Sequence, residues 1–139
     1  MSSPGDSVAG RPAGRRRVLV IDDDDAIREI ADVTLDLVGG WEVMTATSGL
    51  EGLQRAGTWK PDAILLDVMM PGLDGPGTVA RLQADRTTDR IPVILLTAKV
   101  QPAERERFET LPGVLGVIAK PFDPMTLADQ MAELLGWSP

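Results

Sequence analysis

Cysteine and histidine are both absent from this chain of 139 residues, and each absence excludes a kind of chemistry. Without cysteine there are no disulfide bonds and no thiolate metal sites, which fits a reducing compartment. Without histidine the chain lacks the commonest general base, the commonest zinc ligand and any phosphohistidine of its own. Any phosphoryl chemistry that the chain performs must therefore use oxygen nucleophiles.

Long hydrophobic runs are also missing from the sequence. No stretch approaches the roughly 20 apolar residues needed to span a bilayer, so we expect no membrane insertion. The first residues lack the apolar segment of a secretion signal. These features predict a cytoplasmic location.

Positive charge is concentrated at the amino-terminal end of the chain. Residues 1–17 hold four arginines and one aspartate, a net charge of +3; because the whole chain carries −7, the remainder carries −10. Because these residues carry a net negative charge, we do not expect a nucleic-acid surface on the folded domain. Residues 1–15, rich in Ser, Pro, Gly and Ala, are expected to form a disordered basic leader that acts as a solubilising arm.

From Arg17 onward, apolar strand-like runs alternate with helix-like patterns. Most of the strand-like runs are nearly uniform in Val, Ile and Leu, which is typical of strands covered on both faces. The strands are predicted at 17–21, 42–46, 62–66, 92–97 and 114–118. The helices are predicted at 25–38, 48–57, 76–85, 103–111 and 123–135, with Ser48 and Glu51 as a capping box, Gly57 as a helix end and Asp123 as a helix N-cap. Five βα units predict one α/β domain at residues 16–137, built on a five-stranded, doubly wound parallel sheet.

Polar side chains follow four of the predicted strands. The acidic run that begins with Asp22 and Asp23 follows the first strand, and Asp67 ends the third. Thr97 ends the fourth strand and Lys120 follows the fifth. The carboxyl ends of parallel strands share one rim of the sheet, where ligands collect. We therefore expect these residues to lie close together, although they are far apart in the sequence.

Each of these side chains suits a role in phosphoryl transfer. Asp22 and Asp23, together with Asp67, can hold Mg²⁺ through carboxylate oxygens, with Mn²⁺ as an alternative. Asp67 is the predicted nucleophile, because its strand should lie at the centre of the sheet. Thr97 can donate a hydrogen bond to a phosphoryl oxygen. Lys120 can pair with Asp67 before the reaction and with the phosphoryl group afterwards.

The same residues stand in motifs of a known family. The chain reads Val-Leu-Val-Ile-Asp-Asp at 18–23, Leu-Asp-Val-Met-Met-Pro-Gly-Leu-Asp-Gly at 66–75, Leu-Thr-Ala-Lys at 96–99 and Lys-Pro-Phe at 120–122. In combination these motifs closely resemble the receiver domain of two-component response regulators, which has a flavodoxin-like (βα)5 fold. The resemblance covers about residues 16–137.

The resemblance implies a single-domain response regulator, a signalling phosphoprotein and not an enzyme in the usual sense. Asp67 is then the phosphoacceptor, and the donor is a phosphohistidine on a sensor histidine kinase or a histidine phosphotransfer protein. An unknown downstream protein target reads the phosphorylated state. The domain is also expected to catalyse its own phosphotransfer and dephosphorylation.

The resemblance also implies how individual residues bind the metal and the phosphoryl group. Asp23 and Asp67 are implied as direct ligands of Mg²⁺, Met69 as a ligand through its main-chain carbonyl, and Asp22 as a ligand through water. Thr97 and Lys120 are implied to contact the phosphoryl oxygens. A cis peptide bond is implied between Lys120 and Pro121, which suits the small trans preference of bonds that precede proline.

Other residues near the acidic cluster have structural explanations. Asp24 and Asp25 stand where a helix N-cap belongs and suit the positive end of the helix dipole. Ala26, Ile27 and Ile30 on the same helix lie near the cluster. They are candidates for docking the kinase, and each fits the hydrophobic core equally well.

One position departs from the family pattern. Many receiver domains have Tyr or Phe three residues before the lysine, and this ring turns inward when the threonine is drawn to the phosphate. This chain has Val117 at that position. We therefore do not expect the usual coupling between threonine and aromatic ring. Output is expected through the helix at 103–111 or the loop before it.

Two other functions fit part of the pattern. The run Asp22-Asp23-Asp24 fits the Asp-x-Asp opening of haloacid-dehalogenase-like phosphatases, which also use an aspartate nucleophile with Mg²⁺. However, only 19 residues follow Lys120, too few for the later acidic pair of that family, and a cap domain is missing. The other possible function is that of a flavodoxin-like or degenerate receiver that only binds partners. The intact set of site residues argues against it: Asp22, Asp23, Asp67, Thr97 and Lys120.

Overall fold

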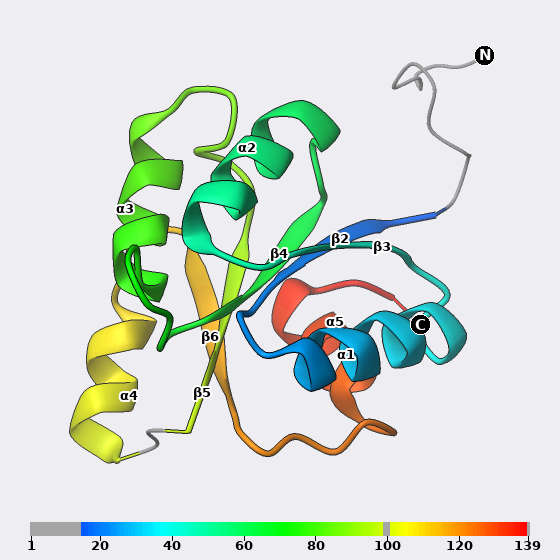
Figure 1. The fold of residues 1–139 in the computed structure, drawn as a ribbon. Coiled ribbons are helices and arrows are strands. Elements are labelled where there is room, and N and C mark those ends of the chain that lie inside the picture. The colour runs from blue at the N-terminus through cyan, green and yellow to red at the C-terminus, as the bar shows by residue number, and fades with distance from the viewer. Residues whose placement is uncertain (1–14, 99–100, 139) are drawn as a thin grey trace.

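Five parallel strands form one sheet in the computed structural model, which describes residues 15–98 and 101–138. The strand order is β3-β2-β4-β5-β6, and helices cover both faces of the sheet (Figure 1). The strands are β2 (Arg17–Ile21), β3 (Glu42–Ala46), β4 (Ala63–Asp67), β5 (Val93–Thr97) and β6 (Val114–Ala119). The helices are α1 (Asp25–Leu37), α2 (Gly49–Trp59), α3 (Gly75–Ala84), α4 (Pro102–Glu109) and α5 (Leu127–Leu135). The predicted doubly wound α/β fold is confirmed.

The order and register of the strands determine where the functional side chains lie. β4 is the central strand, and all of its residues are buried, as are all residues of β5. Ile21 at the end of β2 pairs with Leu66 of β4, and Asp67 pairs with Leu96 of β5. The strands therefore end in line, and the loops after β2, β4 and β5 leave the same edge of the sheet.

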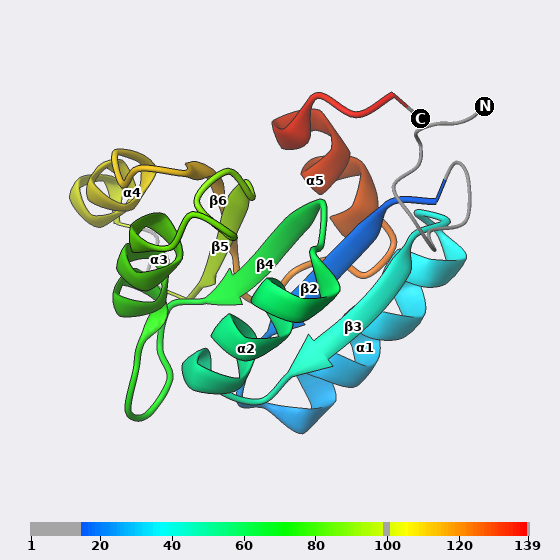
Figure 2. The ribbon, with the colours of Figure 1, turned by 90° about the horizontal axis from the view of Figure 1, so that it is seen from above.

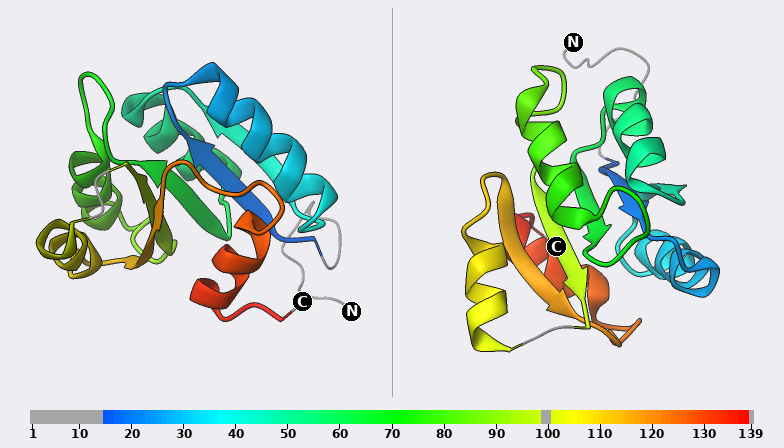
Figure 3. Two further views of the ribbon diagram at one scale, coloured as in Figure 1. Left: turned by 90° about the horizontal axis from the view of Figure 1, so that it is seen from below. Right: turned by 60° about the vertical axis from the view of Figure 1, so that its left-hand side comes forward.

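The sheet separates two hydrophobic cores because successive side chains of a strand point to opposite faces. Helices α2, α3 and α4 cover one face and α1 and α5 cover the other, as the views in Figure 2 and Figure 3 show. Within β2, Leu19 and Ile21 face the first core, whereas Val18 and Val20 face the second. No helix in the described parts of the chain is long and apolar enough to cross a membrane.

Two predicted helix starts are confirmed. Asp24 is the N-cap of α1, and its side chain accepts hydrogen bonds from the main-chain N–H groups of Ala26 and Ile27. Ser48 caps α2 by accepting a bond of 3.1 Å from the N–H of Glu51. The Glu51 carboxylate reaches back to the N–H of Thr47, one residue before the cap, over 2.6 Å.

One predicted helix end and one predicted helix start were wrong, and each has a local cause. α2 does not stop at Gly57; it continues to Trp59 and ends where Lys60 adopts a left-handed φ of 56°. Asp123 is not the N-cap of the last helix, which begins only at Leu127. Instead, the Asp123 side chain accepts a bond of 2.9 Å from Met125 N–H, so a turn precedes the helix.

The basic segment before β2 contacts the folded body. Arg15, the last residue of the predicted leader, donates a hydrogen bond of 2.6 Å to the carbonyl of Trp41. The guanidinium of Arg16 lies 4.6 Å from the ring centre of Trp137. These two arginines therefore help to hold the first strand against α1 and α5; the rest of the predicted leader, residues 1–14, lies outside the described residues.

The close approach of α3 to β4 predicts a cost for a side chain at Gly75. A Cβ atom there would lie 2.7 Å from the carbonyl oxygen of Asp67 and from Cα of Val68, and backbone atoms cannot move aside cheaply. We expect Gly75→Ala to lower the free energy of unfolding by about 1–3 kcal/mol. Urea unfolding followed by circular dichroism measures this change.

Gly57→Ala is the matched control, because Gly57 lies inside α2 and a Cβ there meets only Thr87 Oγ1 at 3.9 Å. This variant should be more stable by roughly 0.4–1 kcal/mol. Equal unfolding midpoints for wild type and Gly75→Ala would contradict the tight contact between α3 and β4.

Candidate functional site

Two buried carboxylates and one lysine meet at the carboxyl edge of the sheet. Asp22 follows β2, Asp67 ends β4 and Lys120 follows β6. Lys120 Nζ lies 3.0 Å from Asp22 Oδ2 and 3.1 Å from Asp67 Oδ1. The structure therefore brings together the acids and the amine that the sequence analysis assigned to one site.

The acids fit a divalent cation. Asp22, Asp23 and Asp67 each offer an oxygen within 4.8 Å of the others, and Asp23 is exposed while the other two are buried. Asp22 Oδ2 is buried and accepts no aligned hydrogen bond in the described structure; its contact with Lys120 is an ion pair. Asp22 and Asp67 place two buried carboxylates against the single positive charge of Lys120, and a hard cation with oxygen ligands would compensate the excess negative charge.

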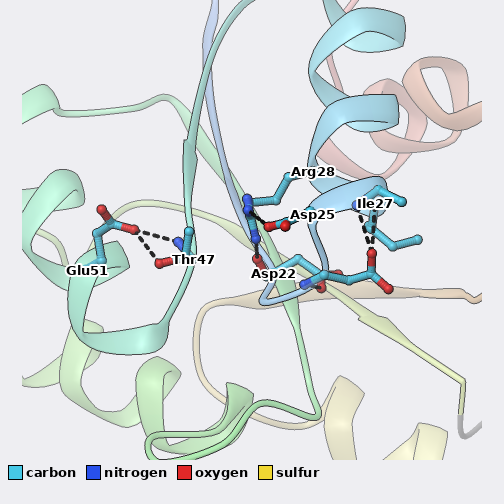
Figure 4. Close-up of polar contacts among 8 residues, drawn as sticks. Asp22, Asp25, Ile27, Arg28, Thr47 and Glu51 are labelled. Carbon is cyan, nitrogen blue, oxygen red and sulfur yellow. Dashed lines mark hydrogen bonds and ion pairs between the residues drawn. The ribbon is translucent and has the colours of Figure 1, made fainter.

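Three hydrogen bonds hold the main chain and side chain of Asp22 in place. Its N–H donates to the carbonyl of Ala46 over 3.2 Å, and its Oδ1 accepts from Asp24 N–H over 2.9 Å. Its carbonyl accepts from Arg28 Nη1 over 2.8 Å (Figure 4). The loop after β2 is therefore fixed to β3, to itself and to α1.

Asp67 is held by the neighbouring strand and by the loop that follows it. The N–H of Val68 donates to the carbonyl of Leu96 over 3.0 Å, which continues the β4–β5 pairing past the strand end. Met69 N–H donates to Asp67 Oδ1 over 3.4 Å, and the Met69 side chain is exposed. The role of the Met69 carbonyl as a metal ligand stays a prediction.

Thr97 lies at the buried end of β5, next to the strand that leads to Lys120. Its main-chain carbonyl accepts a hydrogen bond of 2.9 Å from Lys120 N–H, so the loops after β5 and β6 are joined. The predicted cis bond between Lys120 and Pro121 is confirmed. Lys99, the last residue of the third motif, lies outside the described residues.

Burial and repulsion raise the pKa of Asp67. Removal from water favours the neutral carboxyl, and the charge of Asp22 acts in the same direction. Lys120 opposes both effects without cancelling them, so the pKa of Asp67 rises from 3.8 to about 6. For Lys120, burial alone favours the neutral amine, yet the bonds and charges of Asp22 and Asp67 raise its pKa overall. The lysine therefore stays charged at neutral pH.

Two arginine contacts were not anticipated from the sequence. Arg28 bonds to the Asp22 carbonyl, and Arg105 of α4 donates a bond of 3.0 Å to the carbonyl of Val117, which is buried on β6. The spacing of Asp25 and Arg28 on a helix does indicate an ion pair, which the structure contains. No sequence signal indicates which main-chain carbonyl an arginine reaches.

The model of the response regulator receiver domain matches residues 18–132, most of the chain. The chain belongs to the receiver-domain family of response regulators. Its function is therefore in two-component signalling, and it is a signalling protein.

Similar proteins with known names include regulators of transcription. The chain is 36% identical over 120 residues to the DNA-binding dual master transcriptional regulator RpaA of Synechocystis, covering 86% of this chain and 48% of that protein. It is 35% identical over 124 residues to the alkaline phosphatase synthesis transcriptional regulatory protein PhoP of Bacillus subtilis, covering 86% of this chain and 48% of that one. The chain thus spans about half the length of the curated relatives it matches.

Solved structures with the same fold include receiver domains. The chemotaxis response regulator CheY4 of Vibrio cholerae has a TM-score of 0.79 and 31% identity, with 86% of this chain and 98% of that chain covered. The receiver domain of sensor histidine kinase PA1611 from Pseudomonas aeruginosa has a TM-score of 0.75 and 26% identity, with 88% and 98% covered. The PA1611 domain has a magnesium ion coordinated in its active-site cleft.

The raised pKa of Asp67 predicts how stability depends on pH without metal. The folded state binds the Asp67 proton more tightly than the unfolded state, so the stability from the neutral carboxyl is present below about pH 4 and lost as pH rises through about 6. Asp67→Asn removes the charge. In metal-free buffer at pH 7 the variant should exceed wild type by on the order of 2–3 kcal/mol in free energy of unfolding.

Urea unfolding of both proteins between pH 4 and pH 7.5 measures the difference. It should shrink steadily as the pH falls from 7 to 4. A difference that stays constant over this range would show that Asp67 has an ordinary pKa.

Proposed function

We propose that Asp67 accepts a phosphoryl group from a phosphohistidine of a sensor histidine kinase or a histidine phosphotransfer protein. The observation that carries the proposal is the ammonium group of Lys120, which lies within 3.1 Å of two buried carboxylates, Asp67 at the end of the central strand and Asp22 after the neighbouring strand. Such a group neutralises Asp67 before the reaction and can pair with the phosphoryl group after it. The identity of the kinase and of the downstream protein target is left open.

The reaction is an in-line displacement at phosphorus. A carboxylate oxygen of Asp67 forms the new O–P bond while the P–N bond to the donor imidazole breaks and its electron pair returns to nitrogen. The Thr97 hydroxyl donates to one phosphoryl oxygen and Lys120 pairs with another. Water later attacks the same phosphorus; the O–P bond to Asp67 breaks, inorganic phosphate leaves and the carboxylate is regenerated. In this way the domain also catalyses its own dephosphorylation.

Asp22, Asp23, Asp67 and the main-chain carbonyl of Met69 are proposed to hold Mg²⁺, with Mn²⁺ as the alternative. The excess of carboxylates over the one ammonium group of Lys120 and the common reach of the three acids support this assignment. A bound divalent cation supplies neutralisation of the charge on the phosphoryl oxygens. The domain itself is proposed to act in the cytoplasm through protein contacts and without nucleic-acid binding.

Helix α1 is the proposed docking surface for the phosphodonor. Ile27 packs against the core, so it does not belong to this surface, whereas Ile30 is exposed. Val33 and Leu37 continue the exposed apolar face at helical spacing, and Leu37 is 78% exposed. The surface begins within two helical turns of the acidic loop.

Mass spectrometry of the intact chain tests the phosphoacceptor directly. With acetyl phosphate and Mg²⁺ the wild type should gain about 80 Da, the mass of one phosphoryl group on a nucleophilic carboxylate. Asp67→Asn should gain nothing, and EDTA should prevent labelling of the wild type. Asp74→Asn is the matched control, because Asn also caps a helix and Asp74 caps α3 near the site.

The same experiment separates the alternative functions. If labelling survives in Asp67→Asn and is lost only in Asp22→Asn, the phosphatase-like nucleophile after β2 is correct and the proposal is wrong. If no protein is labelled with or without Mg²⁺, the domain acts only as a binding module.

A further inference from the structure

We propose that Arg28 is a positioning residue for the divalent-cation site. It fixes the Asp22–Asp23 peptide unit and thereby aims the Asp23 carboxylate at the cation. This inference rests on the function proposed above, because it assigns a task to a residue outside the metal ligands themselves.

The guanidinium of Arg28 joins α1 to the loop that carries the acids. Its side chain is only 15% exposed, although it starts from the first turn of a surface helix. Nη1 donates to the Asp22 carbonyl over 2.8 Å, and the other nitrogen pairs with Asp25 (Figure 4). The guanidinium group is planar, and its two partners hold it in one orientation, so the bond to the carbonyl is directional.

A bond to this carbonyl controls the residue that follows it. The carbonyl of Asp22 and the N–H and Cα of Asp23 lie in one rigid peptide plane. Holding the oxygen therefore fixes the rotation of that plane and with it the direction in which the Asp23 side chain leaves the main chain. The next N–H, that of Asp24, is held by Asp22 Oδ1 over 2.9 Å. Both peptide units that flank Asp23 are thus fixed.

Asp23 depends on this main-chain support because its own side chain has none. The carboxylate is exposed, and it makes no hydrogen bond or ion pair with any residue that the structure describes. Asp22 and Asp67 are different, since Lys120 and the surrounding core restrain them. Among the three acids, Asp23 is therefore the one whose direction a clamp on the main chain can set.

Charge and geometry predict opposite results when Arg28 is removed. As a positive charge beside a cation site, Arg28 repels the cation, so a purely electrostatic role predicts tighter metal binding after its removal. If Arg28 instead holds the Asp22–Asp23 peptide unit in place, the Asp23 carboxylate is already oriented before the cation binds. Removal of Arg28 then predicts weaker binding of the cation. The sign of the change therefore distinguishes the two roles.

The test is a titration of the metal-free chain of 139 residues with Mn²⁺, in which free Mn²⁺ is followed by electron paramagnetic resonance. Arg28→Ala should raise the Kd for Mn²⁺ by about 10-fold, the usual size of an effect on a group that orients a metal ligand. Arg28→Lys keeps the charge but lacks the planar guanidinium group that can bond to two partners at once. Its Kd for Mn²⁺ should therefore lie between those of wild type and Arg28→Ala.

Arg17 provides a matched control at the opposite end of β2. Its side chain is 16% exposed, and it bonds to a main-chain carbonyl, that of Trp59, over 2.7 Å. It also pairs with a carboxylate, Glu42, over 3.3 Å. Arg17→Ala should lower the urea midpoint about as much as Arg28→Ala does, yet leave the Kd for Mn²⁺ unchanged.

A second readout separates positioning from general damage. The Mg²⁺ concentration that gives half-maximal labelling by acetyl phosphate should rise about 10-fold in Arg28→Ala, whereas the rate at saturating Mg²⁺ should match wild type. If Arg28→Ala does not fold, Arg28→Lys carries the same comparison.

If wild type binds Mn²⁺ and either Arg28 variant has an unchanged or smaller Kd for Mn²⁺, the inference is overturned and the proposed function stays intact. A different pattern overturns the proposed function. In that case wild type, Asp22→Asn, Asp23→Asn and Asp67→Asn all bind Mn²⁺ equally, which means that these acids do not form the cation site.

Discussion

The ammonium group of Lys120, shared between Asp22 and Asp67, is the interaction on which the site depends. Two buried carboxylates cannot both stay charged at such short range without a cation between them. One lysine is not enough, because the pKa of Asp67 still rises to about 6, and the exposed Asp23 adds a third negative charge nearby. The site therefore retains a deficit of positive charge at the point where a phosphoryl group, itself an anion, would arrive. A divalent cation removes that deficit, which is why metal and phosphoryl group are expected to bind together.

The sheet supplies the geometry that this balance needs. Asp22 follows β2, Asp67 ends β4 and Lys120 follows β6. The main chain at each is fixed by a residue of an adjacent strand: Ala46 of β3 for Asp22, Leu96 of β5 for the residue after Asp67, and Thr97 of β5 for Lys120. The loops after β2, β4 and β6 are therefore held by the strands next to them. The lack of space beside Gly75 has the same effect, because α3 rests directly on the backbone of Asp67. The packing that stabilises the core therefore also fixes the geometry of the site.

The sequence was sufficient for the strands and for the side chains at their ends because both depend on strong local signals. Runs of Val, Ile and Leu are buried on both faces, and the carboxyl edge of a parallel sheet is a property of topology. Helix boundaries were harder to predict because several neighbouring residues are each able to begin or end the helix. Gly57 remains helical because nothing in its surroundings requires a left-handed residue there, whereas Lys60 adopts that conformation. Asp123 bonds to Met125 N–H, which is two residues ahead, and so forms a turn instead of a cap. The contacts of Arg28 and Arg105 depend on the tertiary approach of a helix to one main-chain carbonyl, and residue spacing contains no information about that approach.

These two arginines show how the site can communicate with the surface despite the aliphatic Val117. Arg105 joins α4 to the carbonyl of Val117, and Lys120, three residues later on the same segment, is joined to Thr97 by a main-chain bond. If phosphorylation of Asp67, as proposed, draws Thr97 or Lys120 toward the phosphoryl group, the movement would act on β6 and, through Arg105, on α4 without a rotating ring. On the opposite side, α1 contains the cap Asp24, the Arg28 contact to the Asp22 carbonyl and the exposed apolar face that ends at Leu37. A partner that binds this face holds the helix to which the metal-binding loop is attached. Arg28 and Arg105 thus join two helices on opposite faces of the sheet, α1 and α4, to the main chain of the loop after β2 and of β6.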